Sequence, residues 1–200
     1  MLRKMNNNNE ITVDMTKSVN VSDKSLLPQL AGMEKTSASA ETSNSSDAFK
    51  VFKFAADNST PEWNLKGFGS KGGSTGFLLS TSYDPESVSS GNGSYNPSEL
   101  LFDLHSHPPG SDNIGPSGGL SKAPYSDSYS PSNLGGDLYT MILDFQKNYN
   151  TKHYIYHEGT KKLIYYDLFT AVNKKTQNER GRVMGIMNSA SQMRRIITGR

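Results

Sequence analysis

The sequence contains no cysteine among its 200 residues. This absence excludes a disulfide-stabilised scaffold, a thiolate-ligated zinc or iron–sulfur site, and a cysteine nucleophile. Long hydrophobic runs are missing too, whereas a membrane-spanning helix needs about 20 apolar residues in succession. The first residues, MLRKMNNNNE, lack the apolar core of a signal peptide. We therefore expect that export of this protein would use another route.

Hydrophobic residues are scarce, at 34% of the chain, and adding the 18 glycines still leaves the apolar fraction below the typical ~45–50%. Part of the chain should therefore lie outside a packed core. We assign residues 1–45 to a flexible leader because asparagine repeats at 6–9 and small polar residues fill 36–46. Residues 25–33 interrupt this leader with a short apolar stretch. We predict one domain over residues 46–200.

Charge is distributed unevenly, although the net charge is only +2. Residues 171–200 carry seven basic and one acidic side chain. A basic terminal helix can bind nucleic acid or an acidic partner, or it can simply face solvent. No aromatic side chains alternate with these arginines, as they do in single-strand-binding surfaces. We therefore favour the solvated helix and do not expect nucleic-acid binding.

Hydrophobic periodicity predicts an α/β domain with a mixed β-sheet flanked by helices. The first predicted helix begins at Asp47 and ends at 57–58, because Ala48, Val51, Phe52 and Ala55 recur at helical spacing. Further helices are predicted from Asp137, over 168–179 and over 182–197. Strands are predicted over 60–68, 76–83, 99–107, 153–159 and 162–167. A glycine-, proline- and serine-rich loop over 108–136 is long enough to indicate a functional role.

The segment His105-Ser106-His107-Pro108 closes the predicted strand 99–107. Residues i and i+2 of a strand point to the same face, so the two imidazoles can converge on one metal ion. Asp137 at the start of the next helix is a suitable third ligand, with zinc (Zn²⁺) the metal expected for hydrolysis. Asp112 and Asp127 in the long loop are competing third ligands. Two ordinary surface histidines remain the alternative interpretation.

The H-S-H-P motif followed by a serine and an aspartate resembles the JAMM (MPN+) metallopeptidases, also called JAB-domain proteases. The segments FKFAADNSTPEW, DLHSHPPG and KHYIYHEGTKKLIYY are more similar still to the JAB-like toxin domains of bacterial polymorphic and Rhs-type toxins. The resemblance implies a JAB/MPN-like, cytidine-deaminase-like architecture and zinc-dependent hydrolysis of peptide or isopeptide bonds. It also implies a delivered effector that is cytoplasmic before export, a delivery protein and a cognate immunity protein. A catalytically inactive JAB-like binding module is the alternative.

The resemblance assigns roles to single residues. It matches His105, His107 and Asp137 to the metal ligands, Glu62 to the glutamate that deprotonates the attacking water, and Ser132 to the serine that stabilises the oxyanion. The sequence departs from the motif in two ways: Asp137 follows His107 by 30 residues, and the serine and aspartate are separated by four residues rather than two.

Strand geometry bears on further polar residues near this site. Glu99 shares the face of the histidines but lies roughly 20 Å along the strand from His105, too far to act there. Asp103, only ~7 Å away by the same rise, is a candidate for orienting an imidazole. His153 and His157 in the later hairpin are expected to be structural.

Overall fold

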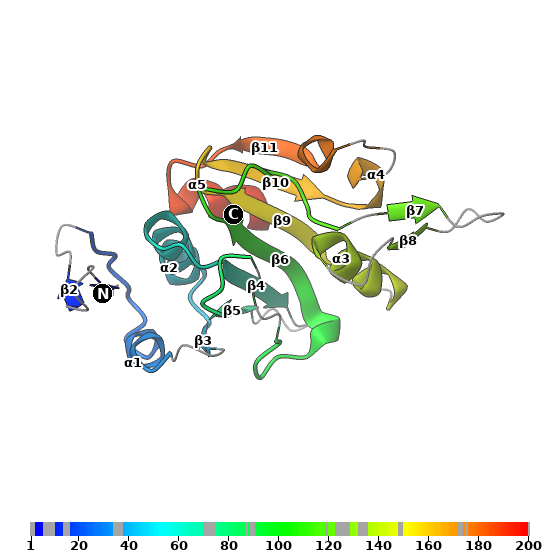
Figure 1. The fold of residues 1–200 in the computed structure, drawn as a ribbon. Coiled ribbons are helices and arrows are strands. Elements are labelled where there is room, and N and C mark those ends of the chain that lie inside the picture. The colour runs from blue at the N-terminus through cyan, green and yellow to red at the C-terminus, as the bar shows by residue number, and fades with distance from the viewer. Residues whose placement is uncertain are drawn as a thin grey trace.

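The computed structural model describes residues 3–5, 11–13, 17–33, 38–69, 75–86, 88, 91–118, 120–122, 129–131, 136–147, 150–171, 174 and 176–199. Seven strands form one mixed sheet in the order β11-β10-β9-β6-β4-β5-β3, with helices packed against it (Figure 1). The predicted α/β class with a mixed, helix-flanked sheet is therefore confirmed.

The strands of the main sheet are β3 (Ala38–Thr42), β4 (Trp63–Gly69), β5 (Thr75–Thr81), β6 (Leu100–His107), β9 (Lys152–His157), β10 (Lys162–Tyr166) and β11 (Arg182–Ile186). The α-helices are α1 (Leu26–Ala31), α2 (Ser45–Asn58), α3 (Asp137–Gln146), α4 (Leu168–Ala171) and α5 (Ala190–Thr198). Short 3-10 turns, η1 (Pro97–Glu99) and η2 (Gln177–Glu179), precede β6 and β11. Two separate ribbons pair β1 (Arg3–Met5) with β2 (Ile11–Val13) and β7 (Leu120–Lys122) with β8 (Tyr129–Pro131).

Strand β6 lies at the centre of the sheet, antiparallel to β4 and parallel to β9. Its side chains alternate between the two faces. Phe102 and Leu104 join the larger core, which also contains Phe49 and Phe52 of α2. His105 and His107 point to the opposite face, where α3 packs its buried Leu138, Met141 and Ile142 against β9 and β10. The period of two thus separates an apolar face of β6 from one that carries functional groups.

The start of the ordered domain differs from the predicted boundary at residue 46. Residues 38–42 form the edge strand β3, which pairs with β5, and Leu26 of α1 is fully buried in the core. Asp47 holds the chain just before α1, because its buried carboxylate accepts hydrogen bonds from the backbone N–H groups of Ser22 and Asp23. The small polar composition of this segment, typical of a linker, therefore concealed a strand that is held by its backbone.

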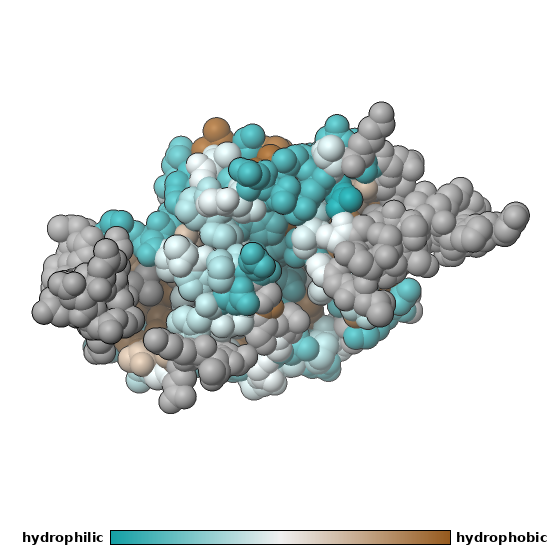
Figure 2. All heavy atoms as spheres, in the orientation of Figure 1, coloured by the Kyte–Doolittle hydropathy of each residue, from teal (hydrophilic) through white to brown (hydrophobic). Residues whose placement is uncertain are grey.

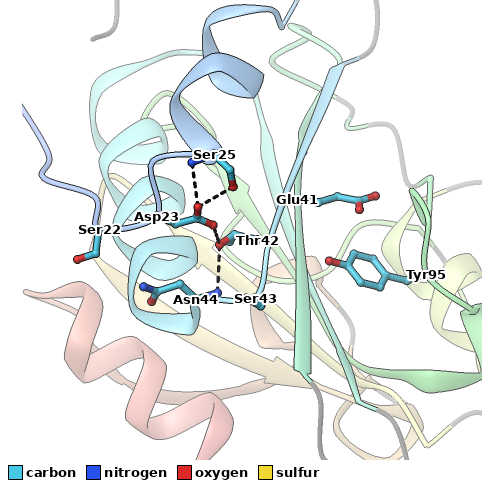
Figure 3. A pocket seen from close by; sticks show the side chains of 8 residues that line it. All are labelled: Ser22, Asp23, Ser25, Glu41, Thr42, Ser43, Asn44 and Tyr95. Atoms are coloured by element: carbon cyan, nitrogen blue, oxygen red, sulfur yellow. Dashed lines mark hydrogen bonds between the residues drawn. The ribbon is translucent and has the colours of Figure 1, made fainter.

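Asp23 also fastens the same segment onto β3. Its carboxylate accepts hydrogen bonds from the hydroxyl groups of Ser25 and Thr42 (Figure 3). These contacts line a shallow hollow of about 510 Å³ that Glu41 and Tyr95 also border. The carboxylate of Glu41 is itself occupied by the backbone N–H and hydroxyl of Ser94.

The prediction of one helix over 182–197 is wrong. Residues 182–186 form β11 and only 190–198 are helical, with Ser189 capping α5 by accepting a hydrogen bond from the Gln192 N–H. Gly185, at φ +147°, breaks the helical run, and Val183 and Ile186 lie exposed on the sheet edge. Figure 2 shows hydrophobic surface at the top of the molecule, over β11.

Two other predicted segments change in part. The helix predicted over 168–179 is divided into α4 and the separate turn η2, which Thr176 and Glu179 stabilise as a capping box. The predicted loop 108–136 contains the β7–β8 ribbon. Among the described residues, the structure has no helix that is both long and apolar enough to span a membrane.

Candidate metal centre

Three candidate ligands converge at the end of β6. The Nε2 atoms of His105 and His107 lie 3.2 Å apart. Asp137 places Oδ1 3.1 Å from His105 Nε2 and Oδ2 3.6 Å from His107 Nε2. Both histidines are only 6% exposed. Within the described part of the chain, these three residues form a group whose ligand atoms all lie within 4.8 Å of one another, close enough to share one ion.

Asp137 is held in place by its own backbone and by Ser117. It is the first residue of α3, where the helix dipole favours a negative charge. Its Oδ2 accepts a 2.7 Å hydrogen bond from the Ser117 N–H, and its own N–H donates to Ser117 Oγ over 3.1 Å. Gly136 makes this close approach possible at φ +80°, a conformation that favours glycine. The candidate third ligand is therefore held in one position before any metal binds.

The donor chemistry of the three residues fits a divalent transition metal. His107 Nδ1 lies 2.9 Å from the carbonyl oxygen of Asn113, which can only accept, so Nδ1 carries the proton. Its Nε2 then presents a lone pair to the centre, the arrangement usual for a metal-binding histidine. Two imidazole nitrogens and a carboxylate oxygen are a set that suits zinc and leave a fourth position for water.

The close approach of His105 and Asp137 shifts the pKa values of both side chains. Burial lowers the pKa of His105, but the charge and hydrogen bond of Asp137, assisted by Glu62 and Asp103, more than offset this effect and raise the pKa to about 9. Burial raises the pKa of Asp137, whereas both imidazoles lower it, and the balance lies well below its usual range. The site thus favours positive charge between the imidazoles and the carboxylate, which a metal cation would supply.

Glu62 lies immediately before β4 and faces the same centre. It is 8% exposed, and burial raises the pKa of its carboxyl group, although the nearby imidazoles of His105 and His107 lower it. Its carbonyl oxygen accepts a 2.8 Å hydrogen bond from the Thr81 hydroxyl, and its N–H donates to Asp84 O over 2.9 Å. A carboxyl with a raised pKa, fixed beside candidate metal ligands, is a stronger base than an exposed glutamate and is suited to proton transfer there.

Two clefts meet at these residues. The smaller, about 200 Å³, runs between β4, β6 and α3, and the larger, about 530 Å³, follows the loop after β6. Glu62, Ser117 and Asp137 line both clefts. An extended substrate could therefore cross the centre with part of its length in each cleft.

Several residues proposed from the sequence lie away from this centre or beyond the described ranges. Ser132 and Asp127 lie outside the described residues, so the predicted role of Ser132 stays a prediction. Asp112 is exposed in the loop after β6. Glu99 lies in η1, before the far end of β6.

The remaining polar candidates contact other groups. Asp103 accepts from the Asn64 amide and pairs with Lys66 of β4, so it acts on His105 only through its charge. His153 is buried with its Nε2 3.5 Å from the Asp144 carboxylate. His157 bonds to Ser111 O and to the Thr160 hydroxyl, and so links the β9–β10 turn to the loop after β6.

Sequence reasoning missed two serines at this centre. Ser106 lies between the histidines and accepts a buried hydrogen bond from the Trp63 N–H, which connects β6 to the residue after Glu62. Ser117 bonds to Asp137 across the residues 118–136 that separate them in the sequence. No spacing in the sequence pointed to Ser117, because residues 118–136 separate it from Asp137 whereas the motif places only two residues between its serine and aspartate.

Comparison with known proteins identifies the family. The family model described as JAB-like toxin 1 matches residues 40–142, from β3 into α3. The matched region includes Glu62, His105, His107 and Asp137. Searches of curated proteins and of solved structures gave no match. Because the matched region covers more than half of the chain, the protein belongs to the JAB-like toxin 1 family and carries a JAB-like toxin domain.

Proposed function

We propose that this toxin domain is a zinc-dependent hydrolase of peptide or isopeptide bonds, acting as the toxic effector of a secreted bacterial toxin. One observation carries the proposal: His105, His107 and Asp137 converge beside the buried carboxyl of Glu62 where two clefts meet. Membership of a toxin family supports the effector role. A cognate immunity protein and a delivery protein are the partners that such a role requires.

His105, His107 and Asp137 would hold the metal. A zinc ion bound there would lower the pKa of a water molecule and polarise the substrate carbonyl. Glu62 acts as the general base, because its carboxyl is buried at the centre and burial raises its pKa, which makes it a stronger proton acceptor than an exposed glutamate. The same carboxyl then delivers that proton to the leaving amine. Burial of Glu62 limits competing exchange with bulk solvent.

Ser117 takes the oxyanion-stabilising role in this proposal. Its Oγ accepts from the Asp137 N–H, so its own hydroxyl hydrogen remains available to donate into the cleft. Ser117 lines both clefts at the centre. A hydroxyl donor fixed beside the reacting carbonyl stabilises the negative charge that develops on the oxygen.

The test expresses three proteins in a susceptible cell: wild type, Glu62→Gln, and the double variant His105→Ala/His107→Ala. Zinc per chain is measured after dialysis of each purified protein, and new peptide termini are mapped in treated cell extracts by mass spectrometry. We expect wild type to be toxic, zinc-loaded and hydrolytic. Glu62→Gln should keep zinc and lose hydrolysis, and the double variant should lose both. Full hydrolysis by Glu62→Gln, or toxicity of a zinc-free wild type, would contradict the proposal.

A further inference from the structure

A buried polar cluster lies beside the metal centre on the same face of the sheet. It consists of Asn64 and Lys66 of β4, Asp103 of β6 and His153 of β9, each no more than 6% exposed. The strand register pairs Asn64 with His105, Lys66 with Asp103, and Asp103 with His153, so the cluster continues directly from the candidate ligands. Residues of these types are rarely buried unless they are paired, so the cluster needs an explanation.

Hydrogen bonding inside the cluster is incomplete. Asn64 Nδ2 donates to Asp103 Oδ1 over 2.5 Å, and Lys66 Nζ lies 3.8 Å from Asp103 Oδ2. Asn64 Oδ1 and His153 Nδ1, however, are buried without a hydrogen-bond partner among the described residues. An unsatisfied buried acceptor costs about 1–3 kcal/mol, which a donor from outside the chain would recover. Asn64 therefore requires a donor that the described part of the protein does not supply.

The smaller cleft gives that donor a place. Asn64 and Asp103 line this space of about 200 Å³, His105 and Asp137 border it at the metal centre, and the exposed Glu86 lies at its margin. Among the described residues, no lysine or arginine lines it. The lining thus combines carboxylates with Asn64, whose buried amide oxygen has no partner among the described residues, and such a site attracts a positively charged hydrogen-bond donor.

We propose that this cleft is the subsite for a basic side chain next to the scissile bond, whose ammonium or guanidinium group donates to Asn64 Oδ1 and to the Asp103 carboxylate. The position next to a scissile bond rests on the proposed hydrolase function, whereas the recognition itself depends only on the cleft. Glu86 attracts the cation at the margin. Asn64 and Asp103 are binding residues in this proposal and take no part in proton transfer.

The test measures binding, so its outcome is independent of hydrolysis. N-acetyl-lysine methylamide and its neutral counterpart N-acetyl-norleucine methylamide are titrated into the zinc-loaded protein, and amide chemical shifts are followed by NMR. The lysine probe should shift resonances around Asn64, Asp103 and Thr140, which all line the smaller cleft. It should bind about tenfold more tightly than the norleucine probe, the difference expected for one charge-assisted hydrogen bond. Equal affinity for the two probes would refute the subsite and would mean that water satisfies Asn64.

Two variants separate recognition from folding. Asn64→Leu should weaken the lysine probe about tenfold and leave the norleucine probe unchanged. Glu86→Gln, at an exposed position where misfolding is not expected, should weaken the lysine probe about twofold or more. Unchanged lysine binding in both variants would overturn the assignment. Selective lysine binding by a protein that hydrolyses nothing would support the subsite and contradict the proposed hydrolase, so the two failures are distinguishable.

Discussion

The hydroxyl oxygen of Ser106 lies 2.9 Å from the backbone nitrogen of Trp63 and accepts its hydrogen bond inside the protein. Ser106 stands between the two histidines on β6, and Trp63 directly follows Glu62. The bond therefore joins the strand of the candidate ligands to the candidate general base. Thr81 of β5 holds the Glu62 carbonyl from the other side. The position of the carboxyl thus depends on both neighbouring strands.

Replacing Ser106 tests this connection. Ser106→Ala leaves the buried Trp63 N–H without an acceptor, which should lower the free energy of unfolding by about 1–3 kcal/mol. It should also reduce hydrolysis by roughly tenfold or more with zinc content unchanged, because a misplaced base transfers protons poorly. Urea denaturation, zinc analysis and the hydrolysis assay measure the three quantities. Ser18→Ala, at an exposed serine, is the control. Unimpaired hydrolysis in Ser106→Ala would disprove the positioning role.

The identity of the third ligand can be tested with two matched aspartates. Asp137→Asn replaces a carboxylate beside both imidazoles, yet its amide oxygen can still accept the Ser117 N–H, so the fold should persist. We expect zinc affinity, measured by competition with a chromogenic chelator, to fall by about 100-fold or more. Asp112→Asn, in the exposed loop, should bind zinc as wild type does. The reverse pattern would make Asp112 the ligand.

The central elements of the fold were predictable because their signals are local. The stripe of α2 and the alternation along β6 follow from periodicities of 3.6 and 2, and two histidines at i and i+2 must share a face. The convergence of Asp137 with them was proposed from its place at a helix start. The contact between Ser117 and Asp137 could not be predicted from the pattern, because residues 118–136 separate the two in the sequence.

The missed elements have a common physical cause. β3 is held by backbone pairing with β5 and by the hydrogen bond from the Thr42 hydroxyl to Asp23, neither of which leaves a hydrophobic pattern in residues 38–42. β11 has apolar residues at a spacing that also fits a helix, and its pairing with β10 is what makes this segment a strand. Tertiary contacts therefore determined the edges of the sheet, whereas sequence periodicity determined its centre.

Because His153 is buried, we predict that the free energy of unfolding falls in acid. Burial, the largest effect, lowers its pKa from 6.5 to about 4, although Asp103 acts in the opposite direction. Between these two pH values the unfolded chain binds a proton that the folded chain does not, so stability falls as the pH is lowered from 6.5 towards 4. The loss should reach about 3 kcal/mol.

Comparison of wild type with His153→Gln isolates this effect, since all other titrating groups are common to both proteins. Urea denaturation of the metal-free proteins at pH 7, 5.5 and 4.5 should show a smaller acid-induced loss in the variant. Parallel loss of stability in the two proteins over this range would show that His153 is protonated normally in the folded state.

Alanine substitutions at two glycines with similar φ values distinguish the effect of backbone strain from the effect of a changed geometry at the metal centre. Gly136 has φ +80°, and a Cβ added there would lie 2.8 Å from Ser117 Oγ and 2.9 Å from the Gly118 nitrogen. Gly199, which ends α5, has φ +74° with nothing within 4 Å of an added Cβ. Gly199→Ala should therefore cost only the strain of a left-handed residue, about 1–2 kcal/mol of unfolding free energy, with zinc affinity unchanged.

Gly136→Ala should show the same strain and also push Ser117 away from Asp137, so zinc affinity should fall by about tenfold or more. Thermal denaturation and the chelator competition give the two quantities for each variant. A reduction of zinc affinity in Gly136→Ala alone would establish that the close approach of residues 117 and 136 keeps the third ligand in position. Equal zinc affinity in the two variants would instead mean that Asp137 is held by α3 and its helix dipole without the support of Ser117.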